Sequence, residues 1–449
     1  MAAPTFFGPW AVSFDADGDV DSAGEQRLVE NLRESHLTDL VVFSHGWNND
    51  EAAASSLYAR WFDLLKAHVG PDHRVGFVGI RWPSQLWRDV TIPDFDPTPD
   101  GTATGAAGLQ ATATAAAGTP VLNPQDVADL KAVFPQGARE LDEIAELLAA
   151  EPSEAGVDEL FRAMQEFNAA VAVESPDGGE PSSAQPAMLD DPAQADKVFE
   201  KFADALIDSG VDITNGESGG AAGVRDRLEK LWRGAKEALR GLSYWQMKNR
   251  AGLVGQRGVG PLIGRIAAQP DFAQVRIHLI GHSFGGRVVS FALAGLPSVD
   301  PSPVKSVTLL EGAFSRFAFS DALPWAPGER GALAGMLSRV DGPLTVCYSS
   351  HDTALSLSYP LASLASGDDR AAAEDPLFRF RAIGSLGAYQ SPTAFIDAVG
   401  TRYAFVNGAI LNIDSSAVVD EGDPPSGAHS DIFHEELAWI VASAAQLTA

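Results

Sequence analysis

The feature that most constrains this chain is a short apolar run, residues 275–280, that leads directly into Gly281-His282-Ser283-Phe284-Gly285-Gly286. The residues that follow can continue as a helix. A serine between two glycines at such a turn is the G-x-S-x-G motif in the strand–turn–helix context that it requires. The positions of Gly281 and Gly285 require residues without a side chain, so that strand and helix can pack closely around the turn. The motif therefore predicts an α/β sheet with the Ser283 hydroxyl exposed above it.

Further short apolar runs predict a sheet of parallel strands. They are continuous rather than alternating, as expected for strands that are buried on both faces. These runs are residues 40–43, 75–80, 304–310, 344–348 and 403–406. Helical stretches lie between several of them, including 23–33 and a longer stretch over 243–268 that glycines interrupt. Strands that alternate with helices predict a mostly parallel, doubly wound α/β sheet.

Residues 89–240 do not follow this alternation. The segment opens with a loop rich in Pro and Asp, continues through 101–118, which is almost entirely Gly, Ala and Thr, and then becomes helical. Apolar residues recur there at helical spacing. They are Leu141, Ile144 and Leu148, then Phe199, Phe202 and Leu206, then Leu228, Leu231 and Trp232. We interpret 89–240 as a helical insertion, with 101–118 and 175–186 as flexible joints, between two parts of an α/β core, 1–88 and 241–449.

The charge of the chain is strongly negative and is concentrated in the insertion. The 449 residues include 32 Lys and Arg against 60 Asp and Glu, a formal net charge of −28. Residues 89–240 hold 29 acidic and 11 basic residues and so account for −18 of it. Such a field repels phosphate backbones, which argues against a nucleic-acid partner. We interpret the insertion as a solvated cap or lid, with a surface for a cationic partner as the alternative.

The composition also bounds membrane association and compartment. Hydrophobic residues make up 45% of the chain and charged residues 20%, which is ordinary for a globular protein. No run approaches the ~20 apolar residues that a membrane span needs, so we expect no integral membrane association. The single cysteine, Cys347, cannot form an internal disulfide, and residues 1–10 lack the pattern of a secretory signal. We therefore expect a cytoplasmic location.

A serine nucleophile needs a base, and the base needs an acid that orients it. Where this motif occurs in hydrolases, the chain order is Ser, then Asp or Glu, then His, so both partners should follow Ser283. Asp352 lies in the loop after the apolar run 344–348 and is the expected acid. Glu311 follows the preceding run, and it is the alternative because a carboxylate at the next strand end could also reach the histidine.

The expected base is His429, in a loop-like run just before the final helix. A loop at that place can hang the imidazole over the serine. Residues 432–445 have helical periodicity, and Ser430 or Asp431 is the expected N-cap. His434 lies one turn into that helix and is expected to be an ordinary packed or surface histidine.

Three other histidines lie beside residues expected in the site. His282 and His351 directly flank Ser283 and Asp352, and we expect each to shape the site or to form hydrogen bonds rather than to carry protons. His45 precedes a glycine near the expected site, but the chain order places the base later. Its ring is therefore expected to be structural.

Acyl transfer also needs donors for the oxyanion of the tetrahedral intermediate. The first is the backbone N–H of Phe284, directly after the serine. The second is expected in Ser44-His45-Gly46-Trp47-Asn48-Asn49, which follows the run 40–43. We assign it to the Trp47 N–H, with Gly46 making the turn.

Together these residues resemble the α/β-hydrolase superfamily, and more closely a bacterial branch of serine esterases and lipases with a Ser-His-Gly-Trp-Asn segment near the N-terminus. The resemblance covers roughly residues 5–90 and 243–447 and leaves 89–240 unaccounted for. Lids in this superfamily commonly follow the strand after the nucleophile, whereas this insertion precedes it. The resemblance implies the same nucleophile, base, acid and oxyanion donors as above: Ser283, His429, Asp352, Trp47 and Phe284.

The predicted function is therefore a serine hydrolase that cleaves a small-molecule or lipid carboxylic ester through an acyl-enzyme. A lipase or phospholipase on aggregated lipid is an alternative, suggested by Trp82, Trp87, Trp232 and Trp245 around the insertion. A peptidase or amidase is another, because the same triad cleaves amides. A non-catalytic binding protein on this fold is the alternative of a different class. Against it stands the expectation that no structural role requires Ser, His and Asp together at the ends of three strands.

Other motifs fail. Residues 15–21 resemble a calcium loop, but positions 6 and 12 are Val20 and Gln26 rather than Gly and Glu, so we expect a polar turn. His434-Glu435-Glu436 lacks the second histidine of a zinc helix. Residues 255–260 are rich in glycine but do not open a helix after a strand. We therefore expect neither a metal nor a cofactor.

Overall fold

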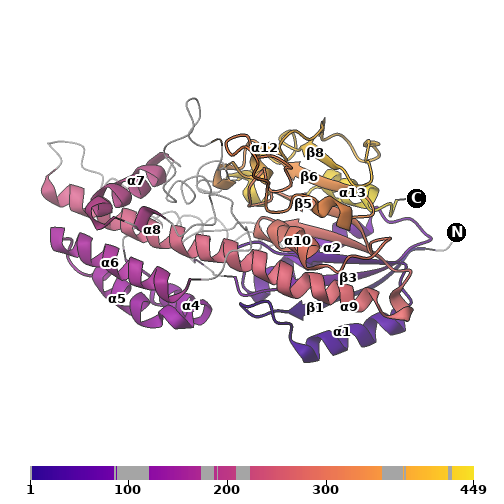
Figure 1. Ribbon diagram of the computed structural model, residues 1–449, viewed down its shortest axis with the longest axis horizontal. Coiled ribbons are helices and arrows are strands. Elements are labelled where there is room, and N and C mark those ends of the chain that lie inside the picture. The colour runs from indigo at the N-terminus through magenta and orange to yellow at the C-terminus, as the bar shows by residue number, and fades with distance from the viewer. Residues whose placement is uncertain are drawn as a thin grey trace, which may run out of the picture.

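The computed structural model describes residues 3–84, 87, 121–172, 187–189, 191–208, 223–355, 378, 381–422 and 427–448. These residues form an α/β part built on one sheet and a group of helices beside it (Figure 1). The loop expected at 89–100 and the joints expected at 101–118 and 175–186 lie outside the described residues.

In the described residues, eight strands form one open sheet in which every neighbouring pair is parallel. The order is β1-β3-β2-β4-β5-β6-β8-β7. The strands are β1 (Thr5–Ser13), β2 (Asp39–Ser44), β3 (Arg74–Arg81), β4 (Arg276–His282), β5 (Val304–Leu310), β6 (Leu344–Tyr348), β7 (Thr393–Phe395) and β8 (Ile410–Asp414). The predicted α/β class is confirmed, and five of the six expected strands are present.

Helices cover both faces of the sheet. Alternate residues of each central strand point to opposite faces, and both faces are apolar and buried. On one face, Leu40 and Val42 of β2 pack in a core with α1 (Ser22–Ser35), α9 (Gly260–Ala267) and α10 (Phe284–Gly295). On the other, Val41 and Phe43 pack with α2 (Glu51–Lys66) and α13 (Glu435–Ala444). Asp21 and Asp50 cap α1 and α2 by accepting backbone N–H groups.

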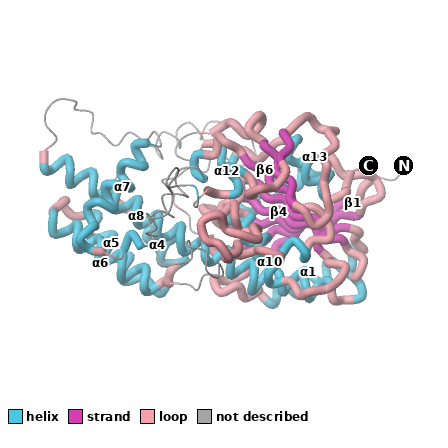
Figure 2. Tube along the Cα trace, turned by 45° about the horizontal axis from the view of Figure 1, so that its top comes forward, coloured by secondary structure: helices cyan, strands magenta, loops and turns pink. Residues whose placement is uncertain are grey.

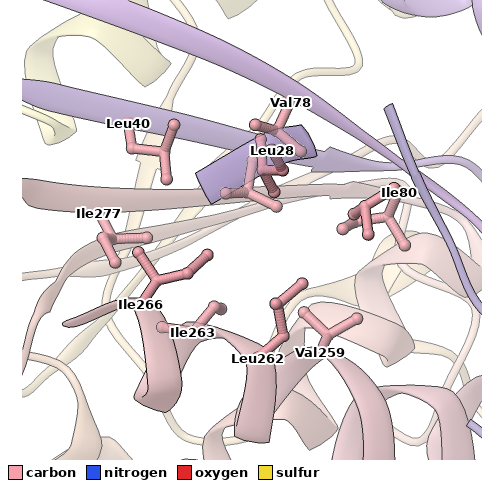
Figure 3. Close-up of a pocket in the computed structure, with 11 residues that line it drawn as sticks. Leu28, Leu40, Val78, Ile80, Val259, Leu262, Ile263, Ile266 and Ile277 are labelled. Atoms are coloured by element: carbon pink, nitrogen blue, oxygen red, sulfur yellow. The ribbon is translucent and has the colours of Figure 1, made fainter. Parts of the chain in front are cut away.

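A small apolar void of about 10 Å³ lies between the sheet and the helices α1 and α9 (Figure 3). Its walls are aliphatic and include Val42, Val78, Ile263 and Ile277. A void of this size barely holds one water molecule, and its walls offer that water no hydrogen bond. The void is therefore a packing defect and not a ligand site.

A long helix, α8 (Val224–Leu253), connects the insertion to the sheet (Figure 1). It is continued by the π-helical segment η5 (Val254–Val259) and by α9. The helix expected over 243–268 is therefore present but begins much earlier, at Val224. The expected glycine interruption is η5, where a Cβ on Gly255 would lie 2.2 Å from the Val288 carbonyl oxygen. The glycine thus lets η5 and α10 pack backbone to backbone.

The other described helices of the insertion lie beside the sheet as a separate group (Figure 2). They are α4 (Pro124–Val133), α5 (Ala138–Ala149), α6 (Glu154–Ala170) and α7 (Ala195–Asp208). The predicted helical spacing is confirmed, since Leu141, Ile144 and Leu148 are buried on one side of α5. The expected boundary at residue 240 falls inside α8. Within the described part of the chain, no helix is long and apolar enough to span a membrane.

Short helical segments complete the described chain. They are η1 (Pro135–Gly137), η3 (Ala187–Leu189), η4 (Pro192–Gln194), η6 (Pro270–Phe272), η7 (Met336–Arg339), α12 (Ile383–Leu386) and η10 (Ala428–Ser430). The last of these carries an expected site residue, His429.

The strand expected at 403–406 is wrong. This stretch has no regular structure: Tyr403 and Phe405 pack against the core beside α2 and α13, and Val406 is exposed. The strand that pairs with β6 is β8, which begins after a turn at Gly408 with φ +70°. The aromatic residues of 403–406 therefore belong to a packed loop. The strand position beside β6 is occupied by β8 instead.

β1 and β7, which no sequence pattern predicted, are the two edge strands of the sheet. β1 contains Gly8 and Pro9 and is largely exposed or half-buried, and β7 has three residues. An edge strand needs no continuous apolar run, because one side of it has no neighbour. The pattern used for the central strands therefore could not find them.

Candidate active site

Ser283 lies between the carboxyl end of β4 and the first turn of α10. Its backbone has φ 54° and ψ −123°, a conformation that residues with a side chain rarely adopt. A Cβ on Gly281 would lie 2.3 Å from the Gly285 carbonyl oxygen, and a Cβ on Gly285 would lie 1.9 Å from that of Ser44. Only glycine fits at either position, which is the physical reason for the spacing of the motif.

Three side chains that are far apart in the sequence meet at this turn. His429 Nε2 lies 2.9 Å from Ser283 Oγ, and His429 Nδ1 lies 2.7 Å from Asp352 Oδ2. The carboxylate can only accept, so Nδ1–H donates to Asp352 and Nε2 accepts from the serine hydroxyl. Asp352 is fully buried, whereas the His429 side chain is 14% exposed. This arrangement can take the serine proton and hold the resulting imidazolium.

The histidine loop is fastened to the loop of the acid. Asp352 and Gly427 form an isolated antiparallel bridge, and the Ala428 N–H donates to the His351 carbonyl over 3.1 Å. His282 Nε2 donates to the His429 carbonyl over 2.8 Å. Burial lowers the pKa of His282 to about 3, so its ring is neutral. Both flanking histidines thus form hydrogen bonds in the site, His282 through its ring and His351 through its backbone.

Glu311, the alternative acid, lies behind Asp352. It follows β5 with φ 47°, is buried, and its Oε2 accepts the Ser349 N–H over 3.2 Å. Its other oxygen, Oε1, is buried and has no hydrogen-bond partner among the described residues. Burial, together with the charge of Asp352, raises the pKa of Glu311 well above its usual range. Asp352, and not Glu311, therefore contacts the imidazole.

The loop after β2 lies directly against the serine. A Cβ on Gly46 would lie 2.6 Å from Ser283 Cβ, so the backbone just before Trp47 approaches the serine closely. The loop is held by Asn49, whose Nδ2 donates to the Trp47 carbonyl over 2.9 Å. Phe284 is the first residue of α10, so its N–H has no acceptor within the helix. Both expected oxyanion donors therefore belong to segments that adjoin Ser283.

His45 belongs to the scaffold of the loop. Its ring stacks on Trp82 at 5.4 Å between centroids, and its Nδ1 donates to the Gly46 carbonyl over 2.9 Å. Burial lowers the pKa of His45 to about 4. The ring is therefore neutral and packed, in agreement with the structural role expected for it.

Tyr244 of α8 also lies at the site, and the sequence analysis did not predict it. Its ring lies 5.2 Å from that of Trp47 and 4.7 Å from that of Phe284. The long helix thus places an aromatic side chain against both residues whose N–H groups are the expected oxyanion donors. No local pattern distinguishes Tyr244 from other aromatic residues of an amphipathic helix.

The expectation for the start of the last helix is wrong. α13 begins at Glu435, and its N-cap residue is His434 rather than Ser430 or Asp431. Asp431 is engaged elsewhere: Oδ1 accepts from the His434 ring over 2.7 Å, and Oδ2 accepts two backbone N–H groups of the preceding loop. The hydrogen bond to Asp431 raises the pKa of His434. Asp431, which was expected to cap the helix, therefore connects the loop that carries His429 to residues 420–421.

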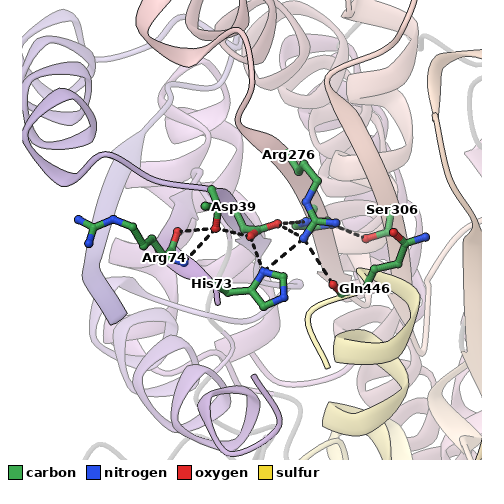
Figure 4. A network of polar contacts seen from close by, with 8 residues as sticks. Asp39, His73, Arg74, Arg276, Ser306 and Gln446 are labelled. Carbon is green, nitrogen blue, oxygen red and sulfur yellow. Dashed lines mark hydrogen bonds and ion pairs between the residues drawn. The ribbon is translucent and has the colours of Figure 1, made fainter. Parts of the chain in front are cut away.

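A second set of the same residue types lies at the opposite ends of the strands, and the sequence analysis missed it. His278 Nε2 lies 3.1 Å from Asp39 Oδ1, and His278 Nδ1 lies 2.9 Å from Ser306 Oγ. Asp39 also pairs with Arg276 at 2.6 Å and bonds His73 at 2.9 Å (Figure 4). Asp39, His278 and Ser306 are almost completely buried.

Hydrogen bonds favour the ionised form of Asp39 in this second set. Burial alone would raise the pKa of Asp39, but its bonds from His278, Thr38 and His73 lower it to about 2. Burial lowers the pKa of His278 despite the nearby carboxylate. The set therefore links β2, β4 and β5 through the hydrogen bonds of His278 with Asp39 and Ser306.

The calcium-like stretch forms the expected polar turn. Asp15 Oδ1 accepts the N–H groups of Asp17 and Asp19 at 3.0 and 2.9 Å, and Asp21 caps α1. Both carboxylates thus serve the backbone. Among the residues that the structure describes, no group of three or more His, Cys, Asp or Glu is placed to hold a metal ion.

Comparison with known proteins adds no relative: no family model, no curated protein and no solved structure matches this chain. Any assignment of function therefore depends on the geometry of the site.

Proposed function

We propose that this chain is a serine hydrolase of the α/β-hydrolase type that cleaves carboxylic esters. One observation carries the proposal: Ser283, on a strained turn, lies 2.9 Å from His429 Nε2, and His429 Nδ1 lies 2.7 Å from Asp352. A buried acid, an oriented imidazole and a serine at a helix N-terminus are the groups that acyl transfer needs.

In this mechanism His429 removes the Ser283 proton as Oγ attacks the ester carbonyl carbon. The N–H groups of Phe284 and Trp47 bind the oxyanion, and Asp352 stabilises the imidazolium. His429 then protonates the departing alcohol, which leaves an acyl group on Ser283. A water molecule that His429 deprotonates attacks the acyl carbon, and the acid is released as Ser283 regains its proton.

The aromatic side chains beside the oxyanion segments support an ester with an apolar part. Tyr244 packs against Trp47 and Phe284, so aromatic surface lies next to the proposed reaction centre. The net charge of −28 supports a substrate that is not a nucleic acid. A cytoplasmic location stays a prediction.

The tryptophans that suggested a lipase do not lie on the surface. Trp82, Trp87, Trp232 and Trp245 are all buried, so they form no surface for a lipid aggregate. The indole N–H of Trp87 donates to Ser243 over 3.1 Å, and that of Trp232 donates to the Leu147 carbonyl over 3.2 Å. These tryptophans belong to the core.

A fluorophosphonate probe tests the nucleophile directly. We expect one adduct on Ser283 in the wild-type protein, none in Ser283→Ala, and unchanged labelling in Ser306→Ala, which alters the second set. No adduct on Ser283 in folded protein, or one that survives Ser283→Ala, would overturn the proposal. An unreactive but folded protein would favour the non-catalytic alternative.

A substrate series then separates esters from amides. We expect hydrolysis of p-nitrophenyl esters of varied acyl length, and little or none of the matching p-nitroanilides. Faster cleavage of the anilides would instead make the protein an amidase or peptidase.

A further inference from the structure

Two carboxyl groups are buried side by side at the site. Glu311 directly follows β5, and Asp352 lies in the loop after β6. Both contact Ser349: Glu311 Oε2 accepts the Ser349 N–H over 3.2 Å, and the Asp352 N–H donates to the Ser349 carbonyl over 3.4 Å. Both residues are at most 1% exposed. Two ionised carboxylates have no proton to share, so a hydrogen bond between these side chains needs a proton on one of them.

The surrounding donors indicate which carboxyl group holds the proton. Asp352 accepts two hydrogen bonds, from His429 Nδ1 over 2.7 Å and from the Leu355 N–H over 2.8 Å. Glu311 accepts one, from the Ser349 N–H, at Oε2. Among the described residues no donor reaches Glu311 Oε1. The negative charge is therefore better solvated on Asp352, and the proton belongs on Glu311 Oε1.

We propose that Glu311 is a neutral carboxylic acid that donates a hydrogen bond to Asp352 and positions it for His429. It is a positioning residue, because it acts on the base only through Asp352. This inference rests on the proposed function for its effect on rate, but the protonation of Glu311 can be tested without any activity.

The charges around Glu311 agree with this assignment. Burial is the largest cause that raises the pKa of Glu311, followed by the charge of Asp352 and the hydrogen bond to it, with a smaller contribution from Asp431. Only the Ser349 N–H opposes the shift. The neighbouring thiol, Cys347, is buried, and the charge of Glu311 would raise its pKa, so the thiol adds no charge.

A neutral donor has a clear advantage at this place. It satisfies a lone pair of the buried Asp352 without adding a second negative charge beside the first. If Glu311 lost its proton, two anions would face each other in a buried pocket, and the repulsion would disturb the carboxylate that orients His429. A glutamine has nearly the same shape, and its amide can donate to Asp352 and accept from Ser349 in the same way.

Stability measured against pH tests the proton directly. An acid with a raised pKa in the folded state keeps a proton that the unfolded chain releases above about pH 4.5, so it lowers stability as pH rises above that value. Glu311→Gln removes this effect. We expect its melting temperature, relative to wild type, to increase from pH 5 to pH 8. A difference that stays constant or decreases over this range would overturn the protonation.

Rates with matched variants test the positioning. We expect Glu311→Gln to keep kcat/KM within about threefold of wild type at pH 7 because the donor is retained, while Glu311→Leu loses about ten- to a hundredfold. The ratio of Glu311→Gln to wild-type rates should not fall as pH rises. Equal losses in both variants, or no loss in a folded Glu311→Leu protein, would overturn the role. If wild type itself neither hydrolyses esters nor labels on Ser283, the proposed function fails, while the stability test still decides the protonation.

Discussion

The two ends of the central strands each carry a serine, a histidine and an aspartate in hydrogen-bonded order. At the carboxyl ends, the histidine of Ser283–His429–Asp352 makes contacts of 2.9 and 2.7 Å. At the amino ends, the histidine of Ser306–His278–Asp39 makes contacts of 2.9 and 3.1 Å. Residue types and distances are alike, so neither of them separates a reactive set from a structural one.

The surroundings do separate them. Ser283 sits on a turn with φ 54°, whereas Ser306 lies within β5, where it pairs with His278 of β4. The His429 side chain is 14% exposed and that of His278 1%. Asp39 is paired with a cation, Arg276, whereas the charge of Asp352 acts on a buried acid, Glu311. If the Ser283 set is reactive, as proposed, we expect that reactivity to depend on backbone strain, access and the surroundings of the acid.

This comparison also corrects an expectation. From the sequence, Ser, His and Asp at the ends of three strands are expected to argue against a non-catalytic protein, because no structural role requires all three together. The set at Asp39, His278 and Ser306 occupies three strands and is sealed inside the sheet. Such a set can thus be purely structural, and only the geometry around Ser283 supports catalysis.

The largest effect should separate the two serines by rate. We expect Ser283→Ala to lower kcat/KM for a p-nitrophenyl ester by about 10³ or more, because the nucleophile is lost. Ser306→Ala should change it by less than about twofold. Equal losses in two folded variants would mean that Ser283 is no more reactive than Ser306.

A second substitution should separate the two aspartates by stability. Asp39→Asn removes a fully buried carboxylate that pairs with the half-buried Arg276 and His73, so we expect the free energy of unfolding to fall by about 3 kcal/mol. The control is Asp341→Asn, which breaks an exposed ion pair with Lys305 and should cost under about 1 kcal/mol. Urea denaturation measures both. A loss for Asp39→Asn no larger than the control would remove Asp39 from its role as the centre of the structural set.

Acid pH should weaken the structural set. The pKa of Asp39 is about 2 in the folded protein against an ordinary value of 3.8, so its ionised form stabilises the fold above about pH 4. This stability, about 2 kcal/mol, is lost as pH falls from 4 to 2. Denaturation curves across this window should therefore be less dependent on pH in Asp39→Asn than in wild type. Equal slopes would show that Asp39 has an ordinary pKa.

The smallest effect concerns the hydroxyl of the structural set. Ser306→Ala removes the partner of His278 Nδ1, and we expect the free energy of unfolding to fall by about 1 kcal/mol. The same denaturation measurement applies. A loss as large as that of Asp39→Asn would make Ser306 an equal partner rather than a minor one.

Local patterns were sufficient for the central sheet and for the elements that carry the candidate site. Continuous apolar runs identified β2, β3, β4, β5 and β6, because strands buried on both faces have no polar side. The glycine spacing around Ser283 identified the strained turn, since only glycine fits between backbones at that distance. Chain order then placed the candidate acid and base after it.

Strand order and long-range packing decided the rest. The edge strands β1 and β7, the use of β8 instead of 403–406, the contact of Tyr244 with the oxyanion segments and the position of Glu311 behind Asp352 all depend on which segments become neighbours. His429 meets residues 77 and 146 positions away. A local pattern reports the burial and backbone shape of its own segment. It carries no record of the distant segment that folding brings beside it.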